Sequence, residues 1–325
     1  MPSRAAFYLI RLCGWLPYSR FLSSKKTVIL LYHGVPRHSD GNHINATVFE
    51  QHVVRLKKQF RIVAHNELRI RRPACEPMRV VLTFDDGFCN HADVVAPILR
   101  KYDAPATFFV CSRPSARGKY LWFTYLQALE ECFQDKGVYF QGIFFDMSPT
   151  KRHVSIRQLS DVLLKLQPHP MAMYEAIEKE LPRLEEFVTT QKLADTYAGM
   201  TAEQLKELGG DPLFSVGVHT LDHPFLTQCK RDEARRQILD NRNWIERITG
   251  KPCESIAYPS GDYNAQVLSD CKQIGLKSGH AVIPQVGINA DFELPRVGIY
   301  SRSLDILEFK AQWGNLIRAL KINVG

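Results

Sequence analysis

The sequence predicts an α/β fold in which parallel strands, arranged as a sheet or a barrel, are surrounded by helices. Two observations predict it: short apolar runs recur along the chain, and amphipathic helical patterns follow them. Strands that alternate with helices are typical of parallel sheets and barrels with the helices outside. The 325 residues, 45% of them hydrophobic and 23% charged, have the composition of a globular protein and can bury a substantial core.

The individual elements follow from local patterns. Apolar runs predict buried strands over residues 28–32, 80–84, 106–110 and 214–218. Thr201 and Gln204 form a capping box that begins a helix, and Gly209 and Gly210 are expected to end it. A further helix that ends at Gly250 is predicted by an apolar stripe, formed by Ala234, Ile238, Leu239, Ile245 and Ile248.

Residues 114–199 interrupt this alternation, and we predict that they form a helical insertion in the barrel. The segment begins with an aromatic stretch (Tyr120, Trp122, Phe123, Tyr125) and continues with a hairpin over 138–145. Two amphipathic helices follow, with apolar positions at Ile156, Leu159, Leu163 and Leu166, and at Met171, Tyr174, Ile177, Leu181, Leu184 and Phe187. These apolar faces need a partner, so the insertion either packs on the barrel or forms a lid or an acceptor-binding cap.

Residues 1–26 are predicted to be an amphipathic N-terminal extension, and residues 27–325 the barrel with its insertion. The longest apolar run of the extension, residues 5–10, is far shorter than the ~20 residues that span a bilayer. Arg11 interrupts the stretch where a signal peptide needs apolar residues. Two interpretations stay open: a helix packed on the domain, or a helix on an anionic membrane surface, held by Arg4, Arg11, Arg20, Lys25 and Lys26.

The cysteine pattern indicates the redox environment of the protein, and its net charge indicates which partners it can bind. The eight cysteines form no CxxC pair, which disfavours a zinc ribbon or disulfide scaffold and favours reduced thiols in the cytosol. A net charge of +8 suits nucleic acid, anionic lipid or acidic glycan. The chain has no RNA-binding signature and no long Lys/Arg block, so we do not expect nucleic acid as a partner. We expect a cytoplasmic protein, peripheral on the inner face of the membrane if the extension binds lipid.

The first polar motif is Asp85-Asp86-Gly87, directly after the predicted strand 80–84. Adjacent carboxylates at a strand end repel each other and are costly unless a cation or donor compensates them. Glycine beside them permits a tight turn or the close approach of another backbone. Taken alone, such a sequence is more often a simple turn.

The second motif runs from His219 to Pro224, after the predicted strand 214–218. His219 and His223, at i and i+4, face the same way if the intervening turn is helical, which is a common arrangement for binding a divalent metal. With Asp86 they make a two-histidine, one-carboxylate set that leaves positions open for water, as catalytic metal sites do. Asp85 would then be a free carboxylate beside this site. Exposed histidines without a ligand are the alternative.

The third motif is Tyr258-Pro259-Ser260-Gly261, after the apolar Ile256. Its turn would present backbone N–H groups to a cleft at a strand end. On this sequence alone, a plain turn is the simpler interpretation.

Together the three motifs resemble those of the NodB-type polysaccharide deacetylases, carbohydrate esterase family four. They occur in the order of that family, as Thr83-Phe84-Asp85-Asp86-Gly87, His219-Thr220-Leu221-Asp222-His223-Pro224 and Tyr258-Pro259-Ser260-Gly261. Two further stretches match, Pro105 to Val110 and Leu294-Pro295-Arg296. The resemblance covers roughly residues 27–112 and 200–300 and implies a distorted (β/α) barrel.

The resemblance also implies a reaction and its residues. Metal-dependent removal of acetyl from an N-acetylated sugar is the family's reaction, with zinc as the usual ion and cobalt or nickel in some members. By resemblance Asp85 is the general base, and the metal ligands are Asp86, His219 and His223. The backbone N–H near Ser260 is the oxyanion donor, within the substrate-binding turn of Tyr258, Pro259, Ser260 and Gly261.

Two departures from the family pattern shift roles to other residues. Many members begin the third motif with an arginine that braces the base, whereas this chain has Ala257, so we expect Arg296 to take over. Many members carry an acid histidine near the C-terminus, but no histidine follows Arg296 here. His33, at the end of the first strand, resembles the acid of a permuted subgroup. The first and last strands of a closed barrel are neighbours, so an acid on the first strand is geometrically reasonable. His280 is the competing candidate for the acid.

We therefore expect a metal-dependent de-N-acetylase acting on a bacterial glycan or its lipid-linked precursor. One alternative is an O-acetyl esterase or a non-sugar amidase on the same scaffold. The other is a catalytically silent glycan-binding protein, against which the intact Asp-Asp-His-His set argues. A serine hydrolase is disfavoured because the chain contains no G-x-S-x-G elbow.

Overall fold

The structure is a computed structural model that describes residues 27–38, 44–70, 76–117, 120–287 and 290–319. The predicted N-terminal extension, residues 1–26, lies outside the described residues. Among the described helices, none is both long and apolar enough to cross a membrane.

A closed barrel of parallel strands forms the centre of the fold and confirms the predicted α/β barrel. The described residues contribute eight strands to its sheet, in the order β1-β10-β9-β8-β7-β4-β3-β2, and β1 also pairs with β3, which closes a ring of seven. The ring consists of β1 (Thr27–Tyr32), β3 (Arg79–Phe84), β4 (Ala106–Val110), β7 (Phe214–Val218), β8 (Ser255–Ala257), β9 (Ser278–Ala281) and β10 (Leu294–Gly298). The short β2 (Arg61–Ile62) pairs with the start of β3.

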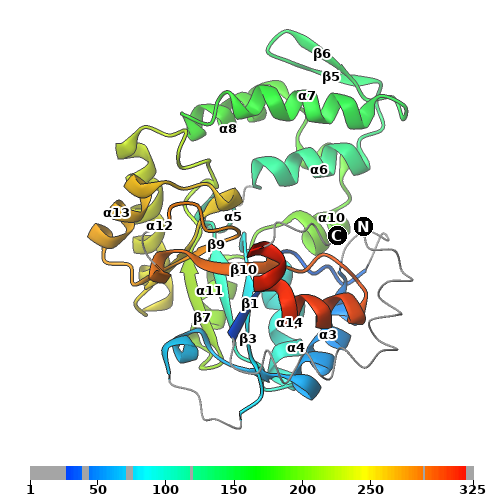
Figure 1. Ribbon diagram of the computed structural model, residues 1–325. Helices are drawn as coiled ribbons and strands as arrows, with labels where there is room; N and C mark the ends of the chain where they lie inside the picture. Colours follow the sequence, from blue (N-terminus) through cyan, green and yellow to red (C-terminus); the bar gives the residue numbers. More distant parts are fainter. Residues whose placement is uncertain (1–26, 39–43, 71–75, 118–119, 288–289, 320–325) are drawn as a thin grey trace.

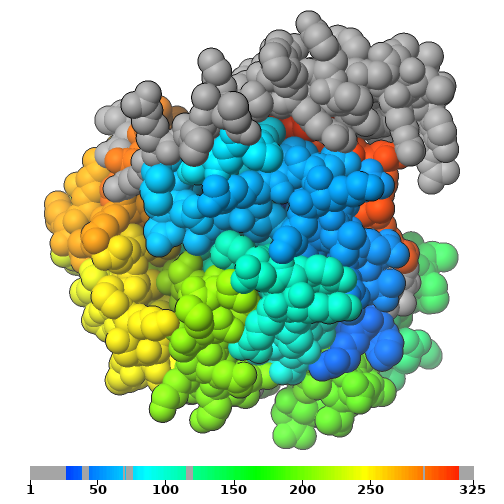
Figure 2. Space-filling view, turned by 90° about the horizontal axis from the view of Figure 1, so that it is seen from below, coloured from blue at the N-terminus to red at the C-terminus, as the bar shows by residue number. Residues whose placement is uncertain are grey.

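Helices cover the outside of this barrel (Figure 1). They are α3 (Ala46–Gln59), α4 (Ala96–Lys101), α11 (Ala202–Gly210), α12 (Arg231–Thr249), α13 (Ala265–Ile274) and α14 (Leu304–Ala319). Short helical turns η1 (His65–Arg69), η2 (His91–Val95), η4 (Pro259–Gly261) and η5 (Ala290–Phe292) lie between them. Seen from below, successive parts of the chain follow one another around the molecule (Figure 2), as expected of a barrel built from alternating strands and helices.

The predicted helix ends agree with the structure. The Thr201 side chain accepts a hydrogen bond from the Gln204 backbone, and the Gln204 side chain accepts one from the Thr201 backbone, so the capping box starts α11. This helix ends at Gly210, the second of the two predicted stop residues. Helix α12 ends at Gly250, whose φ of 67° is the left-handed conformation that glycine adopts readily.

The elements between α5 (Ser112–Arg117) and η3 (Leu193–Tyr197) project from one end of the barrel (Figure 1). They are α6 (Trp122–Cys132), β5 (Gly137–Phe140), β6 (Ile143–Asp146), α7 (Arg152–Leu164), α8 (Pro170–Glu180), α9 (Leu184–Phe187) and α10 (Thr190–Lys192). Their buried apolar side chains form a cluster separate from the barrel core. The predicted hairpin is present as β5 and β6, which are antiparallel.

One predicted helix is wrong in its extent. The apolar pattern predicted a single amphipathic helix that continues to Phe187, but α8 ends at Glu180 and the separate helix α9 begins at Leu184. Pro182 explains the break, because proline disfavours helical backbone in the residue before it, and Leu181 is extended with ψ 154°.

The strand register brings polar residues to one end of the barrel. Ile29 of β1 pairs with Val81 of β3, and both are buried in the same apolar cluster. Side chains two residues apart point to the same face of a strand. The next pair on this inward face of the two strands is therefore Leu31 and Thr83. Two residues further along, just beyond the carboxyl ends of the strands, are His33 and Asp85.

Candidate active site

The predicted site residues gather at the carboxyl ends of the barrel strands, where (β/α) barrels hold their active sites. A cavity of about 610 Å³ opens there. Nine of the ten predicted residues line it: His33, Asp85, Asp86, His219, His223, Tyr258, Ser260, Gly261 and Arg296. Pro259 is buried within its turn and does not line the cavity.

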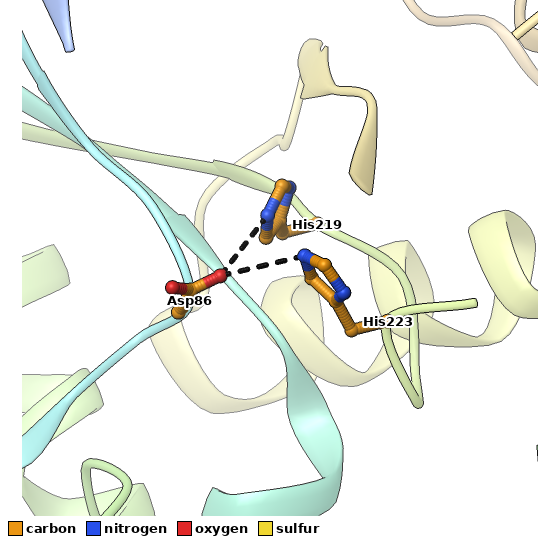
Figure 3. Close-up of side chains that lie close together, drawn as sticks. All are labelled: Asp86, His219 and His223. Carbon is orange, nitrogen blue, oxygen red and sulfur yellow. Dashed lines mark ion pairs between the residues drawn. The ribbon is translucent and has the colours of Figure 1, made fainter. Parts of the chain in front are cut away.

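Asp86, His219 and His223 form a compact group of metal-binding type. The Oδ1 atom of Asp86 lies 3.3 Å from Nε2 of His219 and 3.6 Å from Nε2 of His223, and both rings face the carboxylate (Figure 3). One ligand atom from each residue lies within 4.8 Å of the others, and all three residues are buried. Two imidazole nitrogens and one carboxylate oxygen are a set that suits zinc and related divalent ions.

The histidines converge through a bent loop, and the predicted helical turn between them is absent. Thr220 and His223 both have positive φ, 70° and 54°, which folds the loop back so that the two rings come together. Asp86 and Ser260 at the same site also have positive φ. Non-glycine residues in this conformation are strained, and such strain gathers at functional sites. The two rings thus come together, as the i, i+4 spacing led us to expect, but through a bent loop and not through a helical turn.

Hydrogen bonding directs His219 toward the group. Its Nδ1 lies 2.8 Å from the carbonyl oxygen of Ala257. A carbonyl only accepts, so Nδ1 carries the proton and Nε2 is left free to bind an ion. The backbone N–H of His219 donates to Asn241 of α12, at 3.1 Å, which fixes this end of β7.

The ionised Asp86 and the neutral His223 suit a bound cation, whereas His219 would have to give up a proton to bind one. Burial would raise the pKa of Asp86, but His219 beside it holds that pKa well below its usual range. Burial would lower the pKa of His219, but Asp85 and Asp86 raise it above its ordinary value. Burial and the neighbouring His219 lower the pKa of His223 to about 4, so its ring is neutral. A metal ion would replace the proton of His219 and meet an ionised carboxylate and two imidazoles.

Asp85 is held by Arg296 of β10. The two guanidinium nitrogens Nη1 and Nη2 each donate to one carboxylate oxygen, at 2.6 Å. Burial would raise the pKa of Asp85, but the Arg296 charge and its hydrogen bonds hold it below the ordinary value. The guanidinium lies over the ring of Phe109, 5.4 Å from its centroid. Arg296 therefore lies where the predicted bracing role requires, while the usual arginine position is occupied by buried Ala257.

The two histidines considered for the acid have different surroundings. His33 lines the cavity and stacks on Tyr300, with ring centroids 5.8 Å apart. His280 does not line it; it is fully buried, packs on Phe109, and has Nε2 only 2.8 Å from Nε2 of His65. Burial lowers the pKa of His280 well below its usual range. Of the two, only His33 has access to a substrate.

The third motif forms a tight turn, η4, at the cavity wall. The N–H groups of Gly261 and Asp262 donate back into the turn, to Tyr258 and Pro259. The Tyr258 N–H donates to the His280 carbonyl, and its hydroxyl to Phe292. Ser260 is exposed, and within the described residues no hydrogen bond engages its N–H. Among the N–H groups of this turn, that of Ser260 is the one free to contact a ligand.

One wall of the cavity is aromatic, which the sequence alone did not predict. Trp122 and Phe123 of α6 line it, and the Phe123 ring lies 4.8 Å from the His223 ring. Phe225 and Tyr300 also contribute. The aromatic stretch of residues 120–125 was the available signal, but sequence spacing does not show which barrel end the segment covers.

A buried polar network joins this wall to the histidine loop. Arg113 donates through Nε to Asp222, at 2.9 Å, and lies 3.5 Å above the ring of Tyr174. The Tyr174 hydroxyl donates to the Asp222 carbonyl and accepts from the Trp122 N–H. Because Asp222 precedes His223, helices α6 and α8 help to hold the candidate metal group in place.

The fold and the site define a (β/α)-barrel protein with a candidate metal centre, and comparison with known proteins assigns its family. The sequence model of the family described as "Polysaccharide deacetylase" matches residues 74–135 and 168–279, more than half of the chain. The chain belongs to the polysaccharide deacetylase family, whose enzymes are hydrolases acting on amide C–N bonds. A search of curated proteins finds no matching sequence.

Several solved structures share the fold. The Streptococcus pyogenes deacetylase PplD, in complex with acetate, is 20% identical, with a TM-score of 0.55, covering 91% of this chain and 98% of its own. IcaB from Ammonifex degensii is 19% identical with a TM-score of 0.57, covering 89% and 97%. The BpsB deacetylase domain from Bordetella bronchiseptica is 16% identical with a TM-score of 0.51, covering 84% and 95%. At these identities the similarity supports the barrel fold.

Proposed function

We propose that this protein is a metal-dependent de-N-acetylase that removes acetyl groups from an N-acetylated sugar of a bacterial glycan or its lipid-linked precursor. One observation carries the proposal: an Arg296-braced carboxylate, Asp85, lies beside the Asp86-His219-His223 group in one aromatic-lined cavity. A base next to a candidate metal centre is what amide hydrolysis by water requires.

Asp86, His219 and His223 would hold the ion, and the donor set suits zinc. A divalent ion bound there would supply Lewis acidity, since such an ion polarises a carbonyl oxygen and acidifies water. The residues around it would carry the remaining steps. Asp85, ionised because of Arg296, takes a proton from the water that attacks the acetyl carbon.

The remaining groups act on the charge that develops during the attack and on the leaving amine. The Ser260 N–H donates to the oxygen that gains negative charge, a contribution of about 3–4 kcal/mol for a well-placed donor. His33 then protonates the nitrogen as the C–N bond breaks, because an amine leaves poorly as its anion. The products are acetate and the free amino sugar. The neighbouring Trp122 and Phe123 offer apolar faces against which sugar rings can lie.

Acetate release tests this function. The purified chain, loaded with one equivalent of zinc, should release acetate from N-acetylglucosamine oligomers, and removal of the ion by a chelator should abolish it. Release from an O-acetylated oligomer but not from the N-acetylated one would favour the esterase alternative. Binding of the N-acetylated oligomer without acetate release would favour a silent glycan-binding protein.

A further inference from the structure

We propose that Tyr300 is a positioning residue for His33: its ring sets the plane of the imidazole that protonates the departing amine. The inference rests on the proposed function, in which His33 is the acid.

The strand register places the two rings side by side. Leu31 of β1 pairs with Gly298 of β10, and the Ile299 N–H continues the ladder by donating to the Leu31 carbonyl at 2.9 Å. Two residues beyond this pair are His33 and Tyr300, which therefore point to the same face. Their rings are nearly parallel, with an interplanar angle of 24° and centroids 5.8 Å apart.

Within the described residues, no hydrogen bond orients the His33 imidazole through its Nδ1 atom. This nitrogen is buried. A catalytic histidine is commonly oriented by a carboxylate or a carbonyl on this nitrogen. The flat face of Tyr300, stacked on the imidazole, is a contact that restricts ring rotation here.

The backbone around His33 is already fixed, so ring rotation is the freedom that remains. The His91 ring, through Nε2, lies 3.2 Å from the His33 carbonyl oxygen. The Asn90 side chain accepts from the Val35 N–H at 2.9 Å and donates to the Asp195 carbonyl at 3.0 Å. On a fixed backbone, the direction in which His33 donates its proton is set by its χ angles. Packing around the ring controls those angles.

Tyr300 is itself held in place. Its ring lies against the backbone of Gly298, where a Cβ atom would come within 2.5 Å of the ring atom Cε2. Lys310 of α14 donates to the Gly298 carbonyl at 3.2 Å, and its ammonium lies 5.9 Å from the Tyr300 ring centroid. A side chain at position 298 would therefore displace the Tyr300 ring without removing it.

A different role for Tyr300 makes a different kinetic prediction. The residue lines the cavity and is 59% exposed, so it could instead stack on a sugar. Loss of sugar stacking alone would raise KM for the glycan. Loss of acid orientation would lower kcat, and only for substrates whose leaving group needs a proton.

The experiment compares two substrates across matched variants. For each zinc-loaded full chain, kcat is measured on an N-acetylglucosamine oligomer and on 4-nitrophenyl acetate, whose phenolate leaves without a proton. The variants are Tyr300→Leu, Tyr300→Phe, Gly298→Ala and His33→Ala. The control is Tyr139→Leu, which removes a comparably exposed tyrosine of β5 that does not line the cavity. Zinc content and circular dichroism verify that each variant is folded.

We expect the amide-to-ester ratio of kcat to fall by ~10²–10⁴ in His33→Ala, the usual effect of losing a positioned acid. Tyr300→Leu and Gly298→Ala should lower it by about tenfold, because the acid remains but is misaligned. Tyr300→Phe should recover most of that loss, and Tyr139→Leu should show none. A ratio unchanged in Tyr300→Leu, or a change confined to KM, overturns the proposal. If the wild type releases acetate but His33→Ala keeps its ratio, the acid assignment is wrong; if the wild type releases none, the proposed function fails.

Discussion

Arg296 and Asp85 form a bidentate ion pair inside the barrel, with both N···O distances at 2.6 Å. The two residues come from β10 and from the end of β3, strands that lie on either side of β1. Both side chains are almost fully buried, so each charge is compensated by the other and not by water. A parallel, two-point contact of this kind fixes the carboxylate in one plane and keeps it ionised.

Replacing Arg296 by lysine should therefore reduce activity without loss of metal. Lysine keeps the charge but cannot make the two parallel hydrogen bonds, so Asp85 loses its fixed orientation. We expect acetate release to fall by roughly 10- to 100-fold, with zinc content unchanged. Arg231→Lys, which changes an exposed arginine paired with Asp270, is the matched control. Equal activity of the two variants would contradict the bracing role.

Removing a metal ligand should remove the metal. Wild-type protein should bind one zinc ion per chain, and His219→Ala should lose most of it, because two ligands seldom hold zinc. His153→Ala, which removes an exposed histidine, should retain the ion. Elemental analysis after dialysis measures this directly. Equal zinc content in wild type and His219→Ala would show that the ion is bound elsewhere.

The buried Arg113–Asp222 pair should contribute strongly to stability. Arg113→Met leaves the Asp222 carboxylate buried beside Gln237 without its cation, which typically costs about 3–5 kcal/mol. Urea unfolding of Arg113→Met, Asp222→Asn and the double variant measures the coupling between them. The double variant should lose clearly less than the sum of the two single losses. Additive losses would show that the pair does not act as a unit.

The N-terminal extension should bind anionic membranes weakly and in a salt-sensitive manner. Basic residues near such a surface contribute ~1 kcal/mol each, and residues 4–22 place them among apolar side chains. Co-sedimentation with vesicles containing phosphatidylserine should be stronger for the full chain than for one starting near Lys26. Equal sedimentation at low salt would indicate that the extension is a part of the fold.

Much of the fold could be predicted because its signals are local. Buried strands such as residues 80–84 and 106–110 are short apolar runs, and helix ends at Thr201 and Gly250 depend on neighbouring residues alone. The break at Pro182 was missed because the apolar period continues across it. Periodicity reports which face is buried and not whether the backbone stays helical.

The site residues that belong to short sequence motifs could be predicted. The contacts between residues far apart in the sequence could not. The motifs placed Asp86, His219 and His223 in one group, yet the loop between the histidines is bent by positive φ at Thr220. No spacing rule relates Tyr300 to His33 or Arg113 to Tyr174, because strand register and the packing of α8 create those contacts. Such contacts can be identified only from the three-dimensional structure.

Acetate release by Asp85→Asn and by the wild type, both loaded with one equivalent of zinc, tests directly whether Asp85 is the general base. Asparagine has nearly the same shape but is not a base at neutral pH, and no metal ligand is lost. We expect equal zinc content and a fall in kcat of ~10²–10⁴-fold on an N-acetylglucosamine oligomer, the usual effect of losing a general base. Near-normal acetate release by zinc-loaded Asp85→Asn would contradict this role of Asp85.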